Sequence, residues 1–238
     1  MAPQPRPPLA SYEELAGMIS HTLLKPDLTT PQVVEGLELA KRYRVAAACV
    51  RPCDLDLAVR TLANSPVRPA TVSGFPHGSQ NTATKLFETR DLLRRGAKEI
   101  DLVVAISKLL SREFQHVQTE LTQVSEACLK ENAILTIALE AAYLTDELKI
   151  IACRCCERAG VDFVKTSTGF GPSGYTLEDL RLLRQYLPEE IGIEAEGDLL
   201  TAASVLCVYE AGCSRVSTSA TAAILDEWKA ILAVTKTS

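Results

Sequence analysis

The chain has 238 residues, 47% of them hydrophobic, and a mean hydropathy of +0.07, values typical of a globular protein with a large core. Its formal net charge is −5 and its pI about 5.4, so it lacks the basic character of a nucleic-acid-binding protein, and we expect no nucleic-acid partner. No apolar run approaches the roughly 18 residues that cross a bilayer, so we expect no membrane association.

Residues 1–10 contain four prolines and lack the apolar core of a secretory signal. We therefore expect a flexible proline-rich arm over residues 1–10, one domain over residues 11–238, and a cytoplasmic protein. The eight cysteines include a cluster at Cys153, Cys155 and Cys156, but its spacing matches no zinc pattern. Reduced thiols are the default in that compartment, and we expect no metal site.

Helical and strand patterns alternate along the rest of the chain. After an opening helix over residues 11–20, the predicted strands cover residues 21–24, 45–50, 67–74, 99–105, 134–140, 162–167, 191–195 and 215–218. The predicted helices cover residues 30–44, 54–64, 82–95, 113–131, 145–159, 176–187, 201–211 and 220–233. Pro31 in a first turn, the cap residue Thr176 and the helix-stop residue Gly160 mark some of these boundaries.

Strands that alternate with helices imply parallel pairing and right-handed crossovers. Eight such units in about 210 residues predict an α/β fold, a single-domain (β/α)₈ TIM barrel with an extra N-terminal helix. The alternative is an open doubly wound sheet. It is less favoured because no Gly-x-Gly-x-x-Gly follows an early strand.

A lysine inside a short apolar strand is the most informative chemical feature. Lys165 lies in the segment Val161–Gly171, and burial of a lysine favours its neutral form, which can attack a carbonyl carbon and form an imine. Asp101 interrupts another apolar strand, where a carboxylate needs a cationic partner. Polar residues of the fifth and seventh strands, Glu140 and Glu194, converge on the same barrel interior. Two interpretations stay open: an imine-forming amine with Asp101 as its acid or base, and a structural ion pair.

Other polar residues near strand ends are candidates for substrate binding. Thr166, Ser167, Thr168 and Gly169 follow the lysine directly and are suited to hold an anion or a hydroxylated substrate, although simple turn chemistry explains them as well. Arg51, at the end of the second strand, is suited to an anionic substrate or to a surface role.

Five motifs carry a resemblance to a known family. They are His21–Pro26 (HTLLKP), Gly74–Gly78 (GFPHG), Glu99–Val103 (EIDLV), Tyr143–Thr145 (YLT) and Asp162–Gly171 (DFVKTSTGFG). With them the chain resembles the short, bacterial-type deoxyribose-phosphate aldolases over about residues 19–224, nearly its whole length.

The resemblance implies a class I aldolase on a TIM barrel that cleaves 2-deoxyribose 5-phosphate to glyceraldehyde 3-phosphate and acetaldehyde. It implies that Lys165 matches the Schiff-base lysine and Asp101 the catalytic aspartate, with no metal or organic cofactor. A small-molecule carbonyl substrate is the implied partner, and a homodimer is compatible with the family, in which dimers are common.

The chain departs from the family pattern around the expected site. The family's second active-site lysine is Glu194 here, and a carboxylate beside the imine-forming amine raises the pKa of that amine. In the phosphate-binding turn the chain has Glu196, Gly197 and Asp198, and carboxylates there repel a phosphate dianion. Further replacements are Ser217, in the segment Ser217–Ser219 at the end of the last strand, and Ala105, Thr136 and Arg51 at three other positions. The remaining candidate substrate-binding residues are Glu140, Gly197, Asp198, Ser217 and Ser219.

These departures leave two main hypotheses. In the first, Lys165 keeps imine chemistry with Glu194 as a general base, acting on deoxyribose 5-phosphate weakly or on a less anionic carbonyl compound. In the second, the chain is a non-catalytic barrel that binds a ligand or a partner. A lyase or isomerase that uses carboxylates alone is the remaining alternative.

Overall fold

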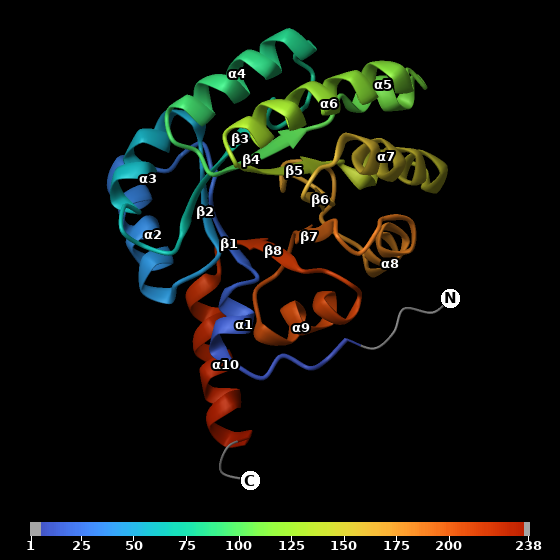
Figure 1. Cartoon of the computed structure of the whole chain (residues 1–238). Helices are drawn as coiled ribbons and strands as arrows, with labels where there is room; N and C mark the ends of the chain where they lie inside the picture. Colours follow the sequence, from blue (N-terminus) through green and yellow to red (C-terminus); the bar gives the residue numbers. More distant parts are fainter. Residues whose placement is uncertain (1–5, 236–238) are drawn as a thin grey trace.

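Eight parallel strands form a closed barrel in chain order, and helices surround it (Figure 1). This computed structural model describes residues 6–235. The first and last strands pair directly, with Ile19 opposite Val216, so the sheet has no open edge. The predicted (β/α)₈ TIM barrel with an extra N-terminal helix is confirmed, and the open doubly wound sheet is excluded.

The strands are β1 (Ile19–Leu23), β2 (Ala47–Val50), β3 (Arg68–Ser73), β4 (Glu99–Val103), β5 (Ile134–Ala138), β6 (Phe163–Lys165), β7 (Gly192–Glu196) and β8 (Arg215–Thr218). The α-helices are α1 (Tyr12–Ala16), α2 (Thr30–Tyr43), α3 (Leu55–Thr61), α4 (Thr82–Arg94), α5 (Ile106–Leu110), α6 (Phe114–Lys130), α7 (Asp146–Ala159), α8 (Leu177–Tyr186), α9 (Ala202–Glu210) and α10 (Thr221–Thr235). Two short 3₁₀ turns are η1 (Pro52–Asp54) and η2 (Ala141–Tyr143).

Side-chain caps fix several helix starts where the sequence indicates them. The hydroxyl of Thr176 accepts a hydrogen bond of 3.0 Å from the backbone N–H of Asp179 and begins α8. Gly160 adopts the left-handed conformation that ends α7, as its position predicts. These caps set the lengths of the loops that lead into and out of β6 and β7.

Two local predictions are wrong. The opening helix α1 ends at Ala16 rather than near residue 20, because Ile19 and Ser20 pair with β8 and belong to β1. The additional helix α5 follows β4, in a segment for which no helix is predicted.

The barrel interior is divided into an apolar half and a polar half. Ala47 and Cys49 of β2 and Ala70 and Val72 of β3 form a small cluster separate from the main core. The main core lies mostly between the strands and the helices. The buried charged groups around Lys165 and Arg215 come from β4, β6, β7 and β8, and Arg68 of β3 joins them at one end.

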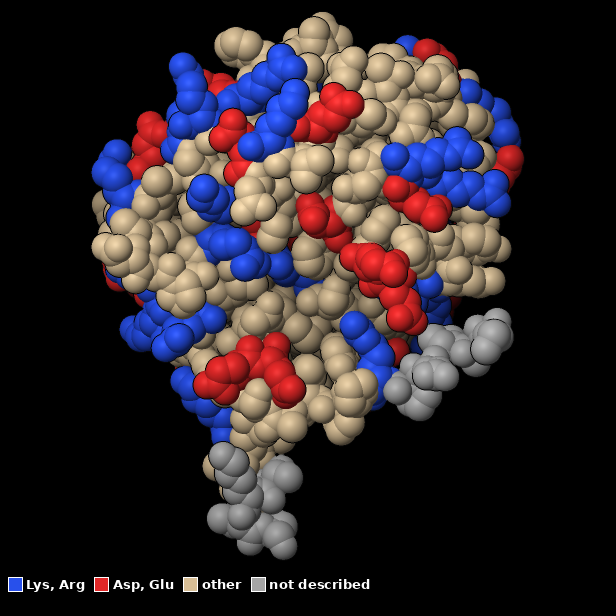
Figure 2. Space-filling model, viewed as in Figure 1, with Lys and Arg blue, Asp and Glu red and all other residues tan. Residues whose placement is uncertain are grey.

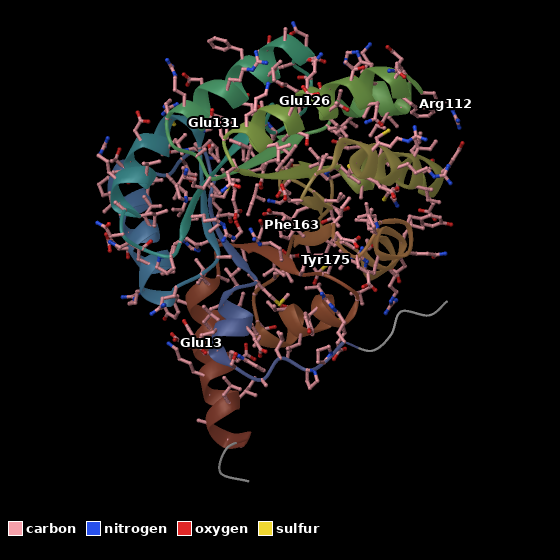
Figure 3. The ribbon with its side chains drawn as sticks, in the orientation of Figure 1. Glu13, Arg112, Glu126, Glu131, Phe163 and Tyr175 are labelled. Carbon is pink, nitrogen blue, oxygen red and sulfur yellow. The ribbon has the colours of Figure 1, made fainter. Side chains whose placement is uncertain are left out.

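Near the amino ends of the strands, the polar half holds a structural charge network. Glu99 accepts a bond of 2.7 Å from the Arg215 guanidinium and pairs also with Arg68. The Arg215 guanidinium lies 4.5 Å from the ring centre of Phe163, which Figure 3 labels near the middle of the molecule. This network closes the amino-terminal end of the barrel beneath the candidate site.

A second buried ion pair lies outside the barrel. The Lys85 ammonium of α4 donates to the Glu120 carboxylate of α6 at 2.9 Å and to the Val103 carbonyl at 2.7 Å. Both side chains are completely buried. The Glu120 carboxylate also accepts from the Ala105 N–H, and so ties the end of β4 to two helices.

Part of the proline-rich segment packs on the barrel. The Arg6 guanidinium donates to the Tyr209 carbonyl at 3.2 Å and lies over the ring of Tyr209, whose hydroxyl donates to the Pro7 carbonyl. Residues 1–5 of the predicted flexible arm lie outside the described residues.

The visible surface carries interspersed charges of both signs (Figure 2). Within residues 6–235, no helix combines the length and the apolar character that crossing a membrane requires.

Removal of one partner of the Lys85–Glu120 pair should strongly destabilise the fold. In Glu120→Ala the Lys85 ammonium would remain buried without its counter-charge, and we expect a loss of roughly 3–5 kcal/mol in the free energy of unfolding. Urea denaturation measures this, and the double variant K85M/E120L should recover most of the loss. Equal stability of Glu120→Ala and the unmodified chain would contradict the assignment.

Candidate active site

The Lys165 ammonium lies inside the barrel, at the last residue of β6. Its Nζ is 2.9 Å from Asp101 Oδ2 of β4, 2.8 Å from Ser217 Oγ of β8 and 2.9 Å from Glu196 Oε2 of β7. Glu194 Oε1 of β7 is 3.4 Å away. The Lys165 side chain is only 2% exposed. The structure therefore brings the predicted residues Lys165, Asp101 and Glu194 together.

Three carboxylates around one ammonium hold the amine in its charged form. Burial, the largest influence, lowers the pKa of Lys165, but the negative charges of Asp101, Glu196 and Glu194 outweigh it and raise that pKa well above the ordinary value. An ammonium has three N–H donors and no lone pair. Two of these donors bond Asp101 and Ser217, and Glu196 Oε2 occupies a third side of the nitrogen at 2.9 Å, so a carbonyl carbon finds no free electron pair on the charged amine.

The surplus negative charge shifts the acids as well. Burial raises the pKa of Asp101 to about 6, and the attraction of Lys165 offsets only part of that shift. Burial also raises the pKa of Glu196 to about 7, and again Lys165 opposes the shift. Glu196 therefore exchanges a proton near neutral pH.

A hydroxyl links the amine to the carboxylate of Glu194. Ser217 Oγ accepts from Lys165 Nζ and donates to the carboxylate of Glu194. The residues lie opposite one another in register, because Lys165 pairs with Glu194 across β6 and β7, and Glu196 pairs with Ser217 across β7 and β8. This chain of bonds is suited to move a proton from the amine to Glu194.

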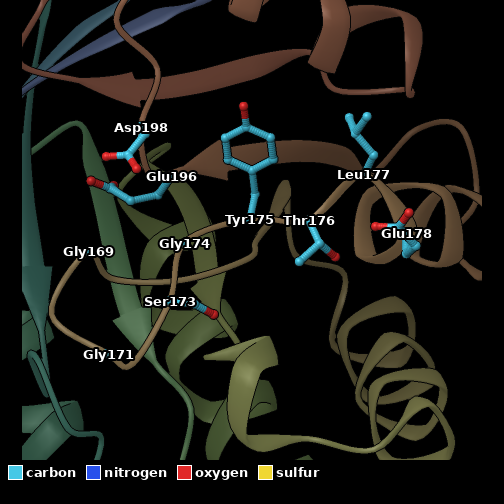
Figure 4. A pocket seen from close by; sticks show the side chains of 11 residues that line it. Gly169, Gly171, Ser173, Gly174, Tyr175, Thr176, Leu177, Glu178, Glu196 and Asp198 are labelled. Atoms are coloured by element: carbon cyan, nitrogen blue, oxygen red, sulfur yellow. The ribbon is translucent and has the colours of Figure 1, made fainter.

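Two cavities open above this cluster. The first has a volume of about 560 Å³ and is bounded by the loop between β6 and α8 and the turn after β7, with the Glu196 and Asp198 carboxylates side by side at its edge (Figure 4). Glu178 is its third acidic lining residue, and no lysine or arginine lines it.

The second cavity, of about 580 Å³, lies toward β1 and α2. Among the predicted substrate-binding residues, its lining includes Thr168, Gly169, Gly197, Asp198, Ser217 and Ser219. His21 and Lys25 also line it, and burial lowers the pKa of His21 to about 4, so this imidazole is neutral at pH 7. The two cavities share Gly169, Glu196, Gly197 and Asp198 as a common wall.

Two of the predicted hydroxyl residues line neither cavity. The hydroxyl of Thr166 accepts from the Glu196 N–H at 3.3 Å, and the hydroxyl of Ser167 donates to the Glu196 carbonyl at 3.0 Å. Both hydroxyls therefore hold the end of β7 instead of facing a substrate.

Glu140 and Arg51 are also directed away from the cavities. The carboxylate of Glu140, 1% exposed, accepts from the Thr168 N–H and holds the loop after β6. The Arg51 guanidinium bonds the Asp54 carboxylate at 2.7 Å and the carbonyls of Lys25, Pro26 and Leu28. Its donors thus tie the loop after β1 to the end of β2.

Glu196 is the site residue absent from the sequence-based set of catalytic candidates. The predicted seventh strand stops at Ala195, whereas β7 extends to Glu196. Side chains two positions apart lie on the same face of a strand. A predicted strand that included residue 196 would therefore have placed Glu196 beside Glu194. Within residues 6–235, no group of three or more histidine, cysteine or acidic side chains is arranged to hold a metal ion.

Stability should fall as the pH rises from about 5 to about 7.5. The pKa of Glu196 and of Asp101 is higher in the folded chain than in the unfolded chain, so the folded chain binds more protons in this window. The stabilisation from these two groups is fully present below their unfolded-state pKa. It is lost as the pH rises through their folded-state pKa. In urea unfolding across this range, the free energy of unfolding should fall less with pH in Glu196→Gln than in the unmodified chain, by on the order of 2 kcal/mol. Parallel curves for the two proteins would contradict the account.

Comparison with known proteins supplies the family. Residues 18–213 match the model of the DeoC/LacD family aldolases. The deoxyribose-phosphate aldolase of Thermoanaerobacter pseudethanolicus is 42% identical over 215 residues, 90% of this chain and 96% of that protein. The one from Caldanaerobacter subterraneus is 41% identical over 220 residues, 92% of this chain and 95% of that protein.

A solved structure agrees with this assignment. The deoxyribose phosphate aldolase of Aeropyrum pernix, described as tetrameric, superposes with a TM-score of 0.86 at 27% identity, covering 94% of each chain. The family match spans most of the chain, and the fold and the buried lysine at the end of β6 are consistent with it. The chain belongs to the DeoC/LacD family of aldolases.

Proposed function

We propose that this chain is a class I aldolase, a carbon–carbon lyase that acts on a small carbonyl compound through an imine at Lys165. The observation that carries the proposal is the contact of 2.9 Å between Lys165 Nζ and Asp101 Oδ2 inside the barrel. An amine and a carboxylate at this distance are what carbinolamine formation and dehydration require.

The residues divide the proton transfers between them. The Lys165 ammonium first loses a proton along Ser217 to Glu194, and the free amine then attacks the carbonyl carbon. Asp101, as an acid, protonates the carbinolamine oxygen so that water leaves and the imine forms. Asp101, now a carboxylate, takes the proton of the substrate's β-hydroxyl as the carbon–carbon bond breaks, and the protonated imine accepts the electron pair, which leaves an enamine and an aldehyde. Asp101 then returns the proton to the enamine carbon, and water hydrolyses the resulting imine to release the second product and regenerate Lys165.

The lining of the cavities favours a substrate with less negative charge than a sugar phosphate. Glu196 and Asp198 flank the turn at Gly197, and a phosphate dianion there would meet two carboxylates. The proposal therefore covers 2-deoxyribose 5-phosphate as a weak substrate and a neutral hydroxyaldehyde as a better one.

A second candidate is a barrel that binds a ligand without catalysis. The observation that favours it is the state of Lys165, which donates to Asp101 and Ser217, pairs with Glu196 at 2.9 Å and lines neither cavity. In that case Lys165 and Asp101 are a structural ion pair.

The proposal includes a cytoplasmic location and self-association, with a homodimer as the simplest form. The tetrameric description of the Aeropyrum pernix relative supports an oligomer. Sedimentation velocity of the purified chain distinguishes the monomer, the dimer and the tetramer.

Reduction in the presence of acetaldehyde should attach an ethyl group to Lys165. The chain is incubated with acetaldehyde and borohydride between about pH 6 and about pH 9, and the modified peptide is identified by mass spectrometry. Lys108→Ala, a surface change, should leave the adduct intact, whereas Lys165→Ala should abolish it. Absence of the adduct from the unmodified chain throughout this range would favour the binding protein.

Removal of a carboxylate from the turn should improve the use of phosphorylated substrates. In Asp198→Gly we expect the ratio of kcat/KM for 2-deoxyribose 5-phosphate to that for 2-deoxyribose to rise by about tenfold, equivalent to about 1.4 kcal/mol. Glu178→Gln is the control on the opposite side of the first cavity. An unchanged ratio in Asp198→Gly would show that Asp198 does not determine phosphate discrimination.

A further inference from the structure

Glu196 is the only member of the acidic cluster around Lys165 that reaches a cavity. It lines both cavities, whereas Lys165, Asp101 and Glu194 line neither. Its side chain is 12% exposed, compared with 2% for Lys165 and Glu194. The Glu196 carboxylate therefore lies between the amine and the space from which a substrate must approach.

The backbone of Glu196 is fixed, so any movement belongs to its side chain. The N–H of Glu196 donates to the Thr166 hydroxyl, and its carbonyl accepts from the Ser167 hydroxyl and from the Tyr175 N–H at 2.9 Å. These three bonds and the pairing with β8 hold the strand end in place.

The surroundings of the Glu196 side chain leave room for such a movement. Glycines flank it at Gly169, Gly174 and Gly197. A β-carbon at Gly169 would lie only 3.0 Å from Glu196 Oε1, and one at Gly174 would lie 2.9 Å from the Glu196 carbonyl oxygen. The first cavity opens directly beside the carboxylate (Figure 4). A side-chain rotation thus suffices to move the carboxylate away from Lys165.

The other contacts of the amine are less able to break. Asp101 lies within a buried strand and lines neither cavity. Ser217 lines the second cavity, but it is fully buried and its hydroxyl is held by hydrogen bonds to both Lys165 and Glu194. Imine formation needs one direction at Nζ to open, and Glu196 occupies the direction that faces the cavities.

We propose that Glu196 is the gate of the imine site: its carboxylate closes the approach to Lys165, and its protonated side chain turns into the neighbouring cavity and opens that approach. This inference rests on the proposed function, since it assigns a catalytic residue to the same reaction. Opening and closing of the gate involve one proton, which Glu196 takes from solvent on opening and returns to solvent on closing.

The gate responds to the charges that face it. Lys165 of β6 attracts the carboxylate, while Glu194 of β7 and Asp101 of β4 repel it, and the exposed Asp198 lies on the same cavity wall. The remaining titratable groups around it are Cys49 of β2, buried in the barrel, and the cavity residues His21, Lys25, Glu35 and Glu178. Because burial among acids raises the pKa of Glu196 to about 7, the gate opens as the pH falls through neutrality.

The test compares the rate of reductive trapping of Lys165 by acetaldehyde in the unmodified chain and in Glu196→Gln. The amide keeps the volume of the side chain but not its charge, so the variant resembles the protonated gate at every pH. We expect Glu196→Gln to be trapped about tenfold faster or more near pH 8, with the ratio of the two rates approaching one near pH 6. Because the Glu196 charge also raises the pKa of Lys165, each rate is divided by the fraction of free amine at that pH, which a ¹⁵N titration of Lys165 Nζ in each protein measures.

Two further variants sharpen the result. Glu157→Gln removes an equal charge from an exposed position on α7 that lines neither cavity, and its trapping rate should stay within about twofold of the unmodified chain. Glu196→Ser removes both charge and volume, should also be trapped faster near pH 8, and serves if the Gln variant does not fold.

The outcomes separate the gate from the reaction. Equal trapping of the unmodified chain and both Glu196 variants at every pH would overturn the gate and leave the imine enzyme standing. A rate ratio that does not change with pH would overturn protonation as the opening event and so the gate as proposed. Absence of a Lys165 adduct in all the variants would overturn the proposed function, and the gate with it.

Discussion

The structure of the site depends on one electrostatic constraint: a single ammonium lies inside a closed barrel with three carboxylates around it. These groups are buried, so each charge needs its partner, and removal of any member would leave the others unbalanced. The surplus of negative charge keeps the Lys165 nitrogen protonated. Burial raises the pKa of Asp101 and Glu196 toward neutrality, and the neighbouring carboxylates add to that shift. Charge balance in the cluster therefore decides when the amine is free to react.

The barrel makes this arrangement possible by dividing its interior. Small apolar residues of β2 and β3 fill one side, while β4 to β8 carry the charged groups. Near the amino ends of the strands, Arg215 and Glu99 form a closed ion pair that no cavity reaches among the described residues. Near the carboxyl ends, Lys165 lies under a movable side chain and two cavities. The same chemistry of buried charge thus serves stability at one end and a reactive site at the other.

Much of this arrangement could be predicted from the sequence. Alternating strand and helix patterns predict the barrel, and an acid and a lysine in apolar strands predict the contact between Asp101 and Lys165. The family motifs add the expected roles of these two residues.

Other features depend on geometry that a single sequence does not show. Glu196 was placed one residue beyond the predicted strand, although the strand's two-residue period extends to it. Arg51 follows a strand at the carboxyl-terminal end of the barrel, where a binding residue is expected. Its guanidinium instead donates to three backbone carbonyls in the neighbouring loop. The orientation of Glu140 depends on its left-handed backbone, with φ of 52°, which directs its carboxylate to the loop after β6.

The protonation state of the Lys165 nitrogen is the most direct measure of the central claim. A titration of ¹⁵N-lysine-labelled protein, with the Nζ resonance assigned through Lys165→Arg, reports that state without any substrate. The account predicts an ammonium signal that persists above the ordinary lysine pKa of about 10.4. A neutral amine signal for Lys165 near pH 8 would contradict it.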